Sequence, residues 1–530
     1  MDTEKDSSNE EEAEPAAAAA PPADAEPESR PEPGPVEPAT QPTPLAEVAD
    51  IVARAAEAQA EWAERPVAER ADIVAQVKRR LLGRAAEIGL LLHQECGKPV
   101  EEAVLSEVLP SADVVDYWTE SIEELLEPRP VELSSFAYPR KHGVILRAPR
   151  GVVALIAPWN FPLAIPWRSL VPALCAGNAV VLKPSELAPR AGALLLSLFE
   201  GLLPDGLVGL VQGGAEAGAA LARAAVDLVV FTGSTRAGRE VAQICAERLV
   251  PCSLELGGKD AAIVLRDCRI ERTARGIAWA AFNNAGQSCC SVERVYVEKA
   301  IAERFLARLV AVTKELRARL DVGTMPSAAQ KRTVAGLLAE TVEAGAEVLV
   351  GGAPDGDDPY FPPTIVKVAA PDCPLLRDEI FGPVLPVLVV ADEDEAVAQA
   401  NASRCALTTS IWTRRTGHGR DLARALRAGV VTVNNHGFTA ALPAAPWTGA
   451  GESGSGVTNS PHALEALTRP RFVLVDRSWA SRELWWYPYT GALGAIAFAL
   501  ARLRGGAGFF GRIVAFFRLL GALIQRALGR

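Results

Sequence analysis

The feature that most constrains this chain is a regular alternation of short apolar runs and helical segments between residues 148 and 255. The apolar runs cover 152–157, 179–182, 207–211 and 228–231, and segments with helical spacing cover 165–173, 191–199, 217–224 and 238–248. Strands that alternate with helices in this way form a parallel sheet. This stretch therefore predicts a doubly wound α/β sheet.

A second α/β series follows from about residue 260 to 446. Its expected strands lie at 261–264, 294–297, 348–350 and 387–390. Residues 45–126 have helical spacing instead, and the short alternating runs of 128–148 suit a β-hairpin or bridging strands. A chain of 530 residues is too long for one hydrophobic core, so two or more domains are expected.

The first 44 residues are mostly Glu, Asp, Pro and Ala, which predicts a disordered acidic leader without a signal peptide. The nine cysteines are an odd number and include no CxxC pair, so we expect no disulfide framework, no metal site and a reducing compartment. The net charge of −11 argues against a nucleic-acid binder. The expected location is the cytoplasm or the cytosolic face of a membrane.

Three turns follow strands of the first α/β series. Residues 231–238 (Phe-Thr-Gly-Ser-Thr-Arg-Ala-Gly) close a strand and open a helix, where backbone N–H groups can approach a phosphate. Residues 213–218 (Gly-Gly-Ala-Glu-Ala-Gly) resemble the dinucleotide fingerprint only loosely. Lys183 and Glu186 have the chemistry to bind ribose hydroxyls. Taken singly, plain tight turns and a solvated surface pair explain these segments as well.

Two further segments carry groups suited to catalysis. Glu255 ends an apolar run and precedes two glycines, so it is a candidate general base in a pocket shared with water. Residues 283–290 (Asn-Asn-Ala-Gly-Gln-Ser-Cys-Cys) present two cysteines on a glycine-containing loop, as a nucleophilic thiolate requires. The alternatives are inert core cysteines or a vicinal redox pair.

Together, six segments resemble the aldehyde dehydrogenase superfamily in order and spacing. They are PWNFPL at 158–163, LKPSE at 182–186, FTGS at 231–234, ELGGK at 255–259, GQSC at 286–289 and EIFGPV at 379–384. The 34 positions from Glu255 to Cys289 are similar to the family's gap between base and nucleophile. The resemblance covers about residues 45–476 and implies an aldehyde dehydrogenase-like α/β fold.

The resemblance divides the chain into parts. A Rossmann-type NAD(P)-binding domain would comprise 45–127 and 148–255, and an α/β catalytic domain would comprise 256–466. Residues 128–147 and 467–476 would form bridging or oligomerisation strands. A homodimer or homotetramer is the expected assembly.

The resemblance also implies the chemistry, which is oxidation of an aldehyde to its carboxylate with NAD(P). Cys289, and not Cys290, would be the nucleophile. The oxyanion would be bound by the Asn160 side chain and the Cys289 backbone N–H. Glu255 would activate the water that hydrolyses the thioester.

The expected cofactor-binding residues are Trp159, Lys183, Glu186, Gly233, Ser234, Glu379 and Phe381. By the same resemblance, Lys183 and Glu186 would hold the adenosine ribose, Ser234 the pyrophosphate and Glu379 the nicotinamide ribose. A carboxylate at the ribose 2′ position accepts a hydroxyl but repels a phosphate. Glu186 therefore favours NAD, with NADP as the alternative.

The motifs define the substrate less well. Phe161 and Trp447 are the expected pocket residues, and Trp447 stands where the family usually has Phe. Gly451 replaces a usual Lys, and residues 405–407 read Cys-Ala-Leu in place of Tyr-Gly-Leu. These departures leave the chemistry untouched but do not identify the aldehyde.

Residues 483–530 form a basic C-terminal tail. Residues 484–501 are uncharged, but Pro488 leaves a helix too short to span a bilayer. On the last helix one side carries Arg512, Arg518, Arg526 and Arg530, and the other carries Ile513, Phe517, Leu520, Ile524 and Leu528. With the aromatic run at 485–487, this predicts a membrane-surface helix and a bias towards long-chain, lipid-derived aldehydes. Docking on the body or on a second subunit is the alternative.

Two other functions compete with this interpretation. A catalytically silent member would act as a scaffold or membrane adaptor, but such a member has no reason to keep Cys289, Glu255 and Asn160. A CoA-acylating dehydrogenase generally lacks the Glu of the ELGG motif, which this chain has.

Overall fold

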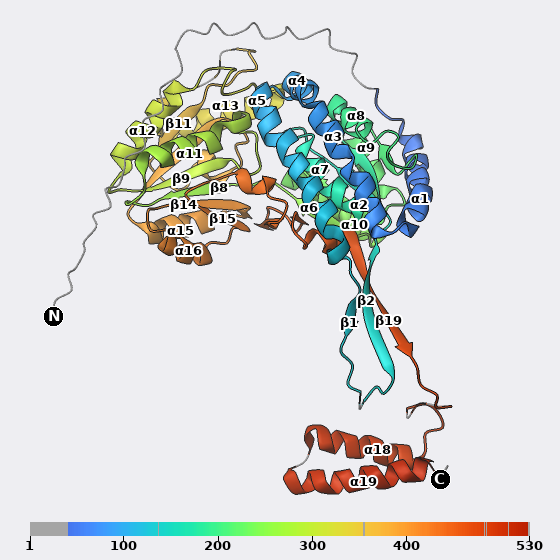
Figure 1. Ribbon diagram of the computed structural model, residues 1–530. Coiled ribbons are helices and arrows are strands. Elements are labelled where there is room, and N and C mark those ends of the chain that lie inside the picture. The colour runs from blue at the N-terminus through green and yellow to red at the C-terminus, as the bar shows by residue number, and fades with distance from the viewer. Residues whose placement is uncertain are drawn as a thin grey trace, which may run out of the picture.

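The computed structural model describes residues 41–527 except 136, 353, 355, 482, 484 and 507. Most of the predicted acidic leader therefore lies outside the described residues, as do Leu528 and Arg530. The described chain forms two α/β lobes side by side, an arm of long strands that leaves the first lobe, and a pair of helices beyond the arm (Figure 1).

The first lobe contains a five-stranded parallel sheet of order β5-β4-β3-β6-β7. Its strands are β3 Val152–Ile156, β4 Ala179–Lys183, β5 Val208–Leu210, β6 Leu228–Thr232 and β7 Cys252–Glu255. All four predicted strands are confirmed, and β3 and β4 are buried along their whole length, as in a sheet covered on both faces. β7 was not predicted, because only alternate residues of its short Cys-Ser-Leu-Glu run are buried.

Helices surround this sheet. They are α1 Val48–Glu64, α2 Val67–Ala75, α3 Val77–Gly83, α4 Ala85–Cys96, α5 Val100–Ala103, α6 Leu109–Leu125, α7 Ala164–Cys175, α8 Pro189–Ser197, α9 Ala215–Arg223 and α10 Thr235–Arg248. Buried indoles fix some of them through backbone contacts: Trp62 donates to Leu174 O at 2.9 Å, and Trp167 donates to Ser111 O at 2.9 Å. The late helix α17 (Ala463–Leu467) also packs into this core.

The second lobe contains a seven-stranded sheet of order β10-β11-β12-β9-β8-β14-β15, parallel except for β10. Its strands are β8 Asp260–Val264, β9 Val292–Glu298, β10 Glu347–Val350, β11 Thr364–Val368, β12 Val384–Val390, β14 Thr408–Trp412 and β15 Val430–Val433. The predicted strands correspond to β8, β9, β10 and β12. The others were missed, since β14 begins with three hydroxyl residues and β11 and β15 contain polar positions.

The remaining elements of the second lobe are helices and short ribbons. The helices are α11 Ile270–Phe282, α12 Ala302–Glu315, α13 Ala328–Glu343, α14 Pro374–Arg377, α15 Glu393–Asn401 and α16 Thr416–Leu422. Two antiparallel ribbons pair β13 (Cys405–Ala406) with β17 (Ala450–Gly451), and β16 (Trp447–Thr448) with β18 (Val457–Thr458). These ribbons lie in the segments that join the two lobes.

The arm is a three-stranded antiparallel sheet of β1 (Arg129–Val131), β2 (Lys141–Pro149) and β19 (Thr468–Asp476), with β2 in the middle. The pairing of β2 with β19 runs from Thr468 opposite Pro149 to Asp476 opposite Lys141. The two segments expected to form bridging strands therefore pair with each other, although more than 300 residues separate them in sequence.

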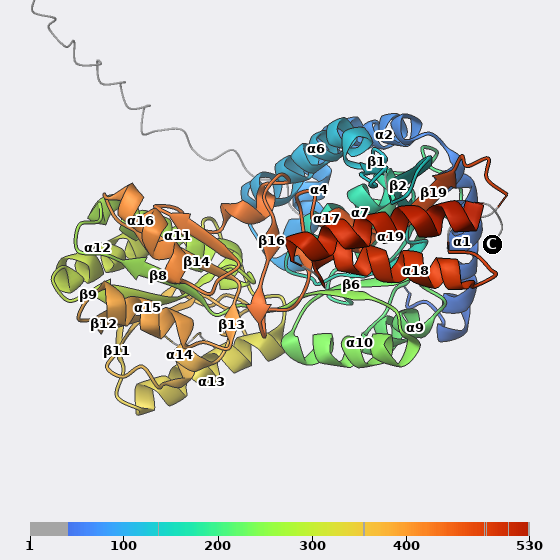
Figure 2. The same cartoon turned by 90° about the horizontal axis from the view of Figure 1, so that it is seen from below.

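The C-terminal tail forms a helical hairpin of α18 (Gly491–Ala501) and α19 (Phe509–Ala527). The two helices lie side by side in both views (Figures 1 and 2). They form a small core of their own from Ile496, Ala499, Leu519 and Ala522. Among the described residues, no helix is both long and apolar enough to cross a bilayer.

One detail of the predicted basic face is wrong. Arg526 is buried and donates to the carbonyls of Trp486 (3.0 Å) and Pro488 (3.3 Å) in the loop before α18. Its charge therefore fastens the end of α19 to that loop, whereas Arg518 is exposed as expected.

Candidate active site

The loop that carries Cys289 follows α11 and a short 3₁₀ turn, Asn283–Gly286. Asn284 and Ala285 have positive φ angles of 51° and 53°, and Gly286 has 71°. A Cβ at Gly286 would lie 2.2 Å from the carbonyl oxygen of Gly382, so only glycine fits there. The GQSC and EIFGP motifs are therefore in direct contact, and the cysteines follow a tightly constrained turn.

Asn160 is held against this loop. Its side-chain Nδ2 donates to Gln287 O at 3.0 Å, and its own carbonyl accepts from Asn284 Nδ2 at 2.9 Å and from Lys98 Nζ at 2.8 Å. The Asn160 amide is therefore fixed two residues from Cys289 along the loop. It retains a second N–H, as an oxyanion donor requires.

Lys98 and Glu107 are site residues that the sequence analysis missed. They form a fully buried ion pair at 2.6 Å, and Glu107 Oε2 also accepts from the backbone N–H groups of Leu163 (2.9 Å) and Ala164 (3.1 Å). The pair thus anchors both sides of the PWNFPL segment. The one sequence signal is the charged pair itself, a Lys and a Glu nine positions apart among buried helices.

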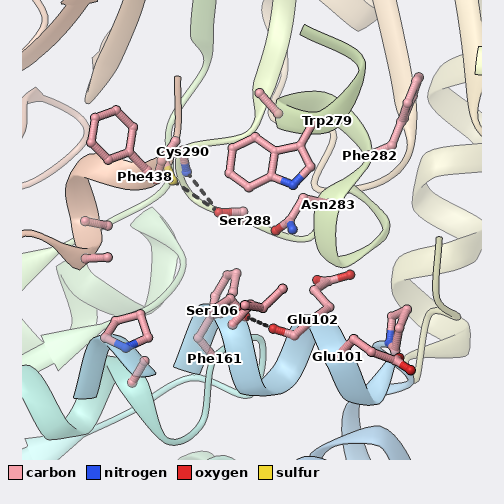
Figure 3. A pocket seen from close by; sticks show the side chains of 18 of the residues that line it. Glu101, Glu102, Ser106, Phe161, Trp279, Phe282, Asn283, Ser288, Cys290 and Phe438 are labelled. Atoms are coloured by element: carbon pink, nitrogen blue, oxygen red, sulfur yellow. Dashed lines mark hydrogen bonds between the residues drawn. The ribbon is translucent and has the colours of Figure 1, made fainter. Parts of the chain in front are cut away.

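The two cysteines differ in access. Cys289 is half-buried and Cys290 is buried, although both line the main cavity, and Figure 3 shows Cys290 turned towards Ser288. The hydrogen bond between the thiols raises the pKa of Cys289, with burial adding to the effect, and lowers the pKa of Cys290 to about 7. The two coupled thiols therefore share a single ionisation near neutrality, and the pair carries one negative charge there. Arg168 favours the thiolate of either cysteine.

Glu255 ends β7 and is buried. Burial raises the pKa of Glu255, while Arg168 and hydrogen bonds from Thr458 and Trp447 act in the opposite direction. The Thr458 hydroxyl donates to Glu255 Oε1 at 2.5 Å. Glu255 is therefore a carboxyl whose proton affinity exceeds that of an ordinary Glu, as suits a general base.

Trp447 lies in a different place from the one expected. It does not line the cavity. It is fully buried and packs with Cys290, Leu407 and Val430, in contact with Cys289. The guanidinium of Arg168 lies 5.9 Å from its ring centre. Trp447 therefore lies between the cysteines and Glu255, and its indole N–H donates to the Glu255 carboxylate.

The cavity in front of Cys289 has a volume of about 590 Å³. Its walls are mostly apolar and include Leu105, Val114, Phe161, Ile165, Trp279, Phe282 and Phe438 (Figure 3). The predicted pocket residue Phe161 is among them. Arg168 lies in the wall, and Glu101 and Glu102 line the side opposite Asn283 and Ser288. Burial raises the pKa of Glu102 to about 7.

A second set of predicted residues lies at the carboxyl ends of β4 and β6, where doubly wound sheets bind nucleotides. Buried Lys183 pairs with exposed Glu186 at 3.4 Å. Gly233 follows β6, and the Ser234 hydroxyl caps α10 by accepting from Ala237 N at 3.3 Å. A cationic amine, a carboxylate and a capped helix N-terminus at one sheet edge fit the ribose and pyrophosphate of a dinucleotide.

The EIFGP residues complete this side of the site. Glu379 Oε1 accepts from Gly258 N at 3.3 Å, and a Cβ at Gly257 would lie 2.3 Å from the Glu379 oxygens. Phe381 packs edge-on against Trp159, with ring centres 5.8 Å apart. The structure thus brings Glu379, Phe381 and Trp159 next to the segment that carries Glu255.

These contacts join segments far apart in the chain, and they agree with a comparison with known proteins. The model of the aldehyde dehydrogenase family matches residues 37–473. The chain belongs to the aldehyde dehydrogenase family. It is therefore an oxidoreductase with the aldehyde dehydrogenase-like α/β fold that the six motifs predict.

Relatives of this aldehyde dehydrogenase are named for different substrates. It is 37% identical to 4,4'-diapolycopene aldehyde oxidase of Methylomonas sp, over 81% of this chain and 82% of that protein. It is 34% identical to the NAD(+) benzaldehyde dehydrogenase of Pseudomonas putida, over 78% and 86%. The crystal structure of PnpE from Pseudomonas sp. WBC-3, also solved in complex with nicotinamide adenine dinucleotide, has a TM-score of 0.79, 32% identity, and coverage of 83% and 91%.

Proposed function

We propose that this aldehyde dehydrogenase oxidises its aldehyde through a thioester on Cys289, with NAD as the preferred oxidant. The observation that carries the proposal is the position of Cys289, which is half-buried at the base of an apolar cavity. Asn160 is fixed beside it, and Glu255 lies behind it across Trp447.

The residues divide the reaction between them. The Cys289 thiolate attacks the aldehyde carbon, and the Asn160 amide and the Cys289 backbone N–H stabilise the oxyanion. NAD, when bound, accepts the hydride that leaves this carbon. Glu255 then takes a proton from water, which attacks the thioester and releases the carboxylate and the thiolate. The buried Arg168 stabilises the negative charge of both the Glu255 carboxylate and the Cys289 thiolate.

We assign cofactor binding to the two sets of residues beside this centre. Lys183 and Glu186 hold the adenosine ribose, Gly233 and Ser234 the pyrophosphate, and Glu379 the nicotinamide ribose. Trp159 and Phe381 form one wall. Because Glu186 is exposed where the ribose 2′ position would lie, it disfavours a 2′-phosphate, and NAD is preferred over NADP.

The cavity supports a large, apolar aldehyde. Its volume is within the range of drug-sized ligand sites, and aromatic and aliphatic side chains form most of its wall. A relative that is 37% identical to this chain is named 4,4'-diapolycopene aldehyde oxidase, and this name supports the proposal. We therefore propose long-chain, lipid-derived aldehydes as the substrate class.

The hairpin supports a peripheral location on the cytosolic face of a membrane. Large apolar side chains remain exposed on it, including Phe498, Phe509, Phe510, Phe516 and Phe517. Contiguous exposed apolar surface of this kind marks an interaction site. On the arm, the edge strand β19 leaves Phe472, Leu474 and Val475 exposed, and we propose this edge as the contact of a homodimer or homotetramer.

A panel of straight-chain aldehydes tests the reaction and the substrate class together. We expect kcat/KM, followed by NADH absorbance, to rise with chain length and to be higher with NAD than with NADP. Cys289→Ala should abolish turnover and keep NAD binding, whereas the matched Cys290→Ala should keep most activity. Turnover in Cys289→Ala would contradict the mechanism, and a preference for short, charged aldehydes would contradict the substrate class.

A further inference from the structure

A buried carboxylate on β9 holds the loop that carries Glu379. Glu293 accepts from the backbone N–H groups of Ile380 at 2.9 Å and Phe381 at 2.8 Å, and from Lys259 Nζ at 2.8 Å. The side chains of Glu293 and Lys259 are both almost completely buried. The Glu293 side chain thus accepts hydrogen bonds from two consecutive N–H groups of the EIFGP motif, which begins its contact 87 positions further along the chain.

The loop needs such a clamp because its conformation is unfavourable. Phe381 has a φ of 51°, in the left-handed region that is unfavourable for a residue with a side chain. The other side of the loop is held by Gln330, whose Nε2 donates to Ile380 O at 2.9 Å. Removing one partner of a buried ion pair leaves an uncompensated charge, so Glu293 and Lys259 depend on each other.

We propose that Glu293, paired with Lys259, is a positioning residue for cofactor binding, which fixes Glu379 and Phe381 against the nicotinamide half of the cofactor. The proposal rests on the proposed role of Glu379 in binding the nicotinamide ribose. It goes further by naming the residues that determine how that carboxyl is placed and when it is ionised.

The electrostatics of Glu379 support this role. Burial, and then the negative charge of Glu293, raise the pKa of Glu379 to about 8, while Gly258 N–H and Lys259 oppose them. The thiol of Cys405 also faces Glu379. Ribose hydroxyls donate hydrogen bonds, so they favour the ionised carboxylate. NAD affinity should therefore increase as the pH rises through about 8, where Glu379 loses its proton.

Calorimetric titration of NAD into the full chain, without aldehyde, tests the inference between pH 6.5 and 9.5. Glu293→Gln keeps an acceptor for the loop but removes the charge, so the midpoint of the pH dependence should move lower. Glu293→Ala also removes the acceptor, so NAD should bind about tenfold more weakly even at pH 9.5. Glu298→Gln is the matched control, since Glu298 is a buried, ion-paired carboxylate on the same strand that contacts Arg266.

The outcomes are distinguishable. An unchanged midpoint in Glu293→Gln, or equal shifts in Glu298→Gln, would overturn the inference, provided that Glu379→Gln still weakens NAD binding. Unaltered NAD binding in Glu379→Gln would instead overturn the proposed cofactor role. If Glu293→Ala does not fold, the nearly isosteric Glu293→Gln still decides the question through its midpoint.

Discussion

At the scale of single residues, the most informative group is Glu255. Its carboxyl is buried beside Thr458 and Trp447, and burial raises its pKa above the ordinary value for Glu. A general base works only when ionised, so thioester hydrolysis should fail as the pH falls through this raised pKa. Glu255→Gln cannot accept the proton at any pH.

We therefore expect Glu255→Gln to give a pre-steady-state NADH burst close to one equivalent, followed by turnover at least about 100-fold slower. Rapid mixing with excess aldehyde measures both phases. Thr458→Val, which removes one hydrogen bond but keeps the carboxylate, is the control and should retain the steady-state phase with a shifted acid limb. A normal steady-state rate in Glu255→Gln would remove this residue from the mechanism.

The same scale shows where sequence reasoning stops. Cys289, Glu255 and Asn160 lie in motifs that can be recognised locally. In the structure Asn160 is hydrogen-bonded to the loop of Cys289, and Trp447 contacts both Cys289 and Glu255. Lys98, Glu107 and Glu293 cannot be recognised in that way. Their partners include backbone N–H groups or carbonyls at least 56 positions away, and a backbone group leaves no mark in the sequence.

At the scale of elements, the turn between α11 and Cys289 is the critical one. It has three consecutive positive φ angles and touches the backbone of Gly382. Gly286→Ala should therefore shift the loop and lower kcat by more than tenfold, while far-ultraviolet circular dichroism stays native. Gly336→Ala is the matched control, because a Cβ there meets nothing within 4 Å and alanine favours the helix α13. Equal activity of both variants would show that the turn is not critical.

Elements were predictable where burial is continuous. β3 is apolar along its whole length and β8 is apolar after Asp260, so their apolar runs alone locate them. β14 is just as buried, yet it begins with Thr408, whose hydroxyl is satisfied by Asp260 at 2.6 Å. A polar residue with a buried partner is indistinguishable in sequence from an exposed one. In the tail the prediction failed in the opposite direction. Arg526 was expected on an exposed basic face, but it is buried and donates to backbone carbonyls, which the sequence does not show.

At the scale of the whole molecule, the hairpin is set apart from both lobes at the end of the arm (Figure 1). Its inner face is buried where α18 packs against α19, so the exposed phenylalanines do not contribute to the packing of the two helices. Residues 485–527 contain five arginines and no acid. Trp485, Trp486, Tyr487 and Tyr489 are partly or largely exposed at its base, as is typical of side chains at a lipid–water interface. An anionic bilayer surface complements both the charge and the apolar face.

Co-sedimentation with vesicles tests this surface. The full chain should partition onto vesicles rich in anionic lipid, and a chain ending at Ser481 should stay in solution as an active enzyme. Arg518→Gln should reduce binding about fivefold on anionic vesicles and leave binding to neutral vesicles unchanged, since one arginine near such a surface contributes about 1 kcal/mol. Phe516→Ser with Phe517→Ser should weaken binding to both kinds of vesicle, because these rings enter the apolar layer. Arg526→Gln is a poor reporter of charge, since its guanidinium is buried against the loop. If the chain ending at Ser481 loses its oligomeric state in analytical ultracentrifugation, or sediments with vesicles as the full chain does, the hairpin contacts protein and not lipid.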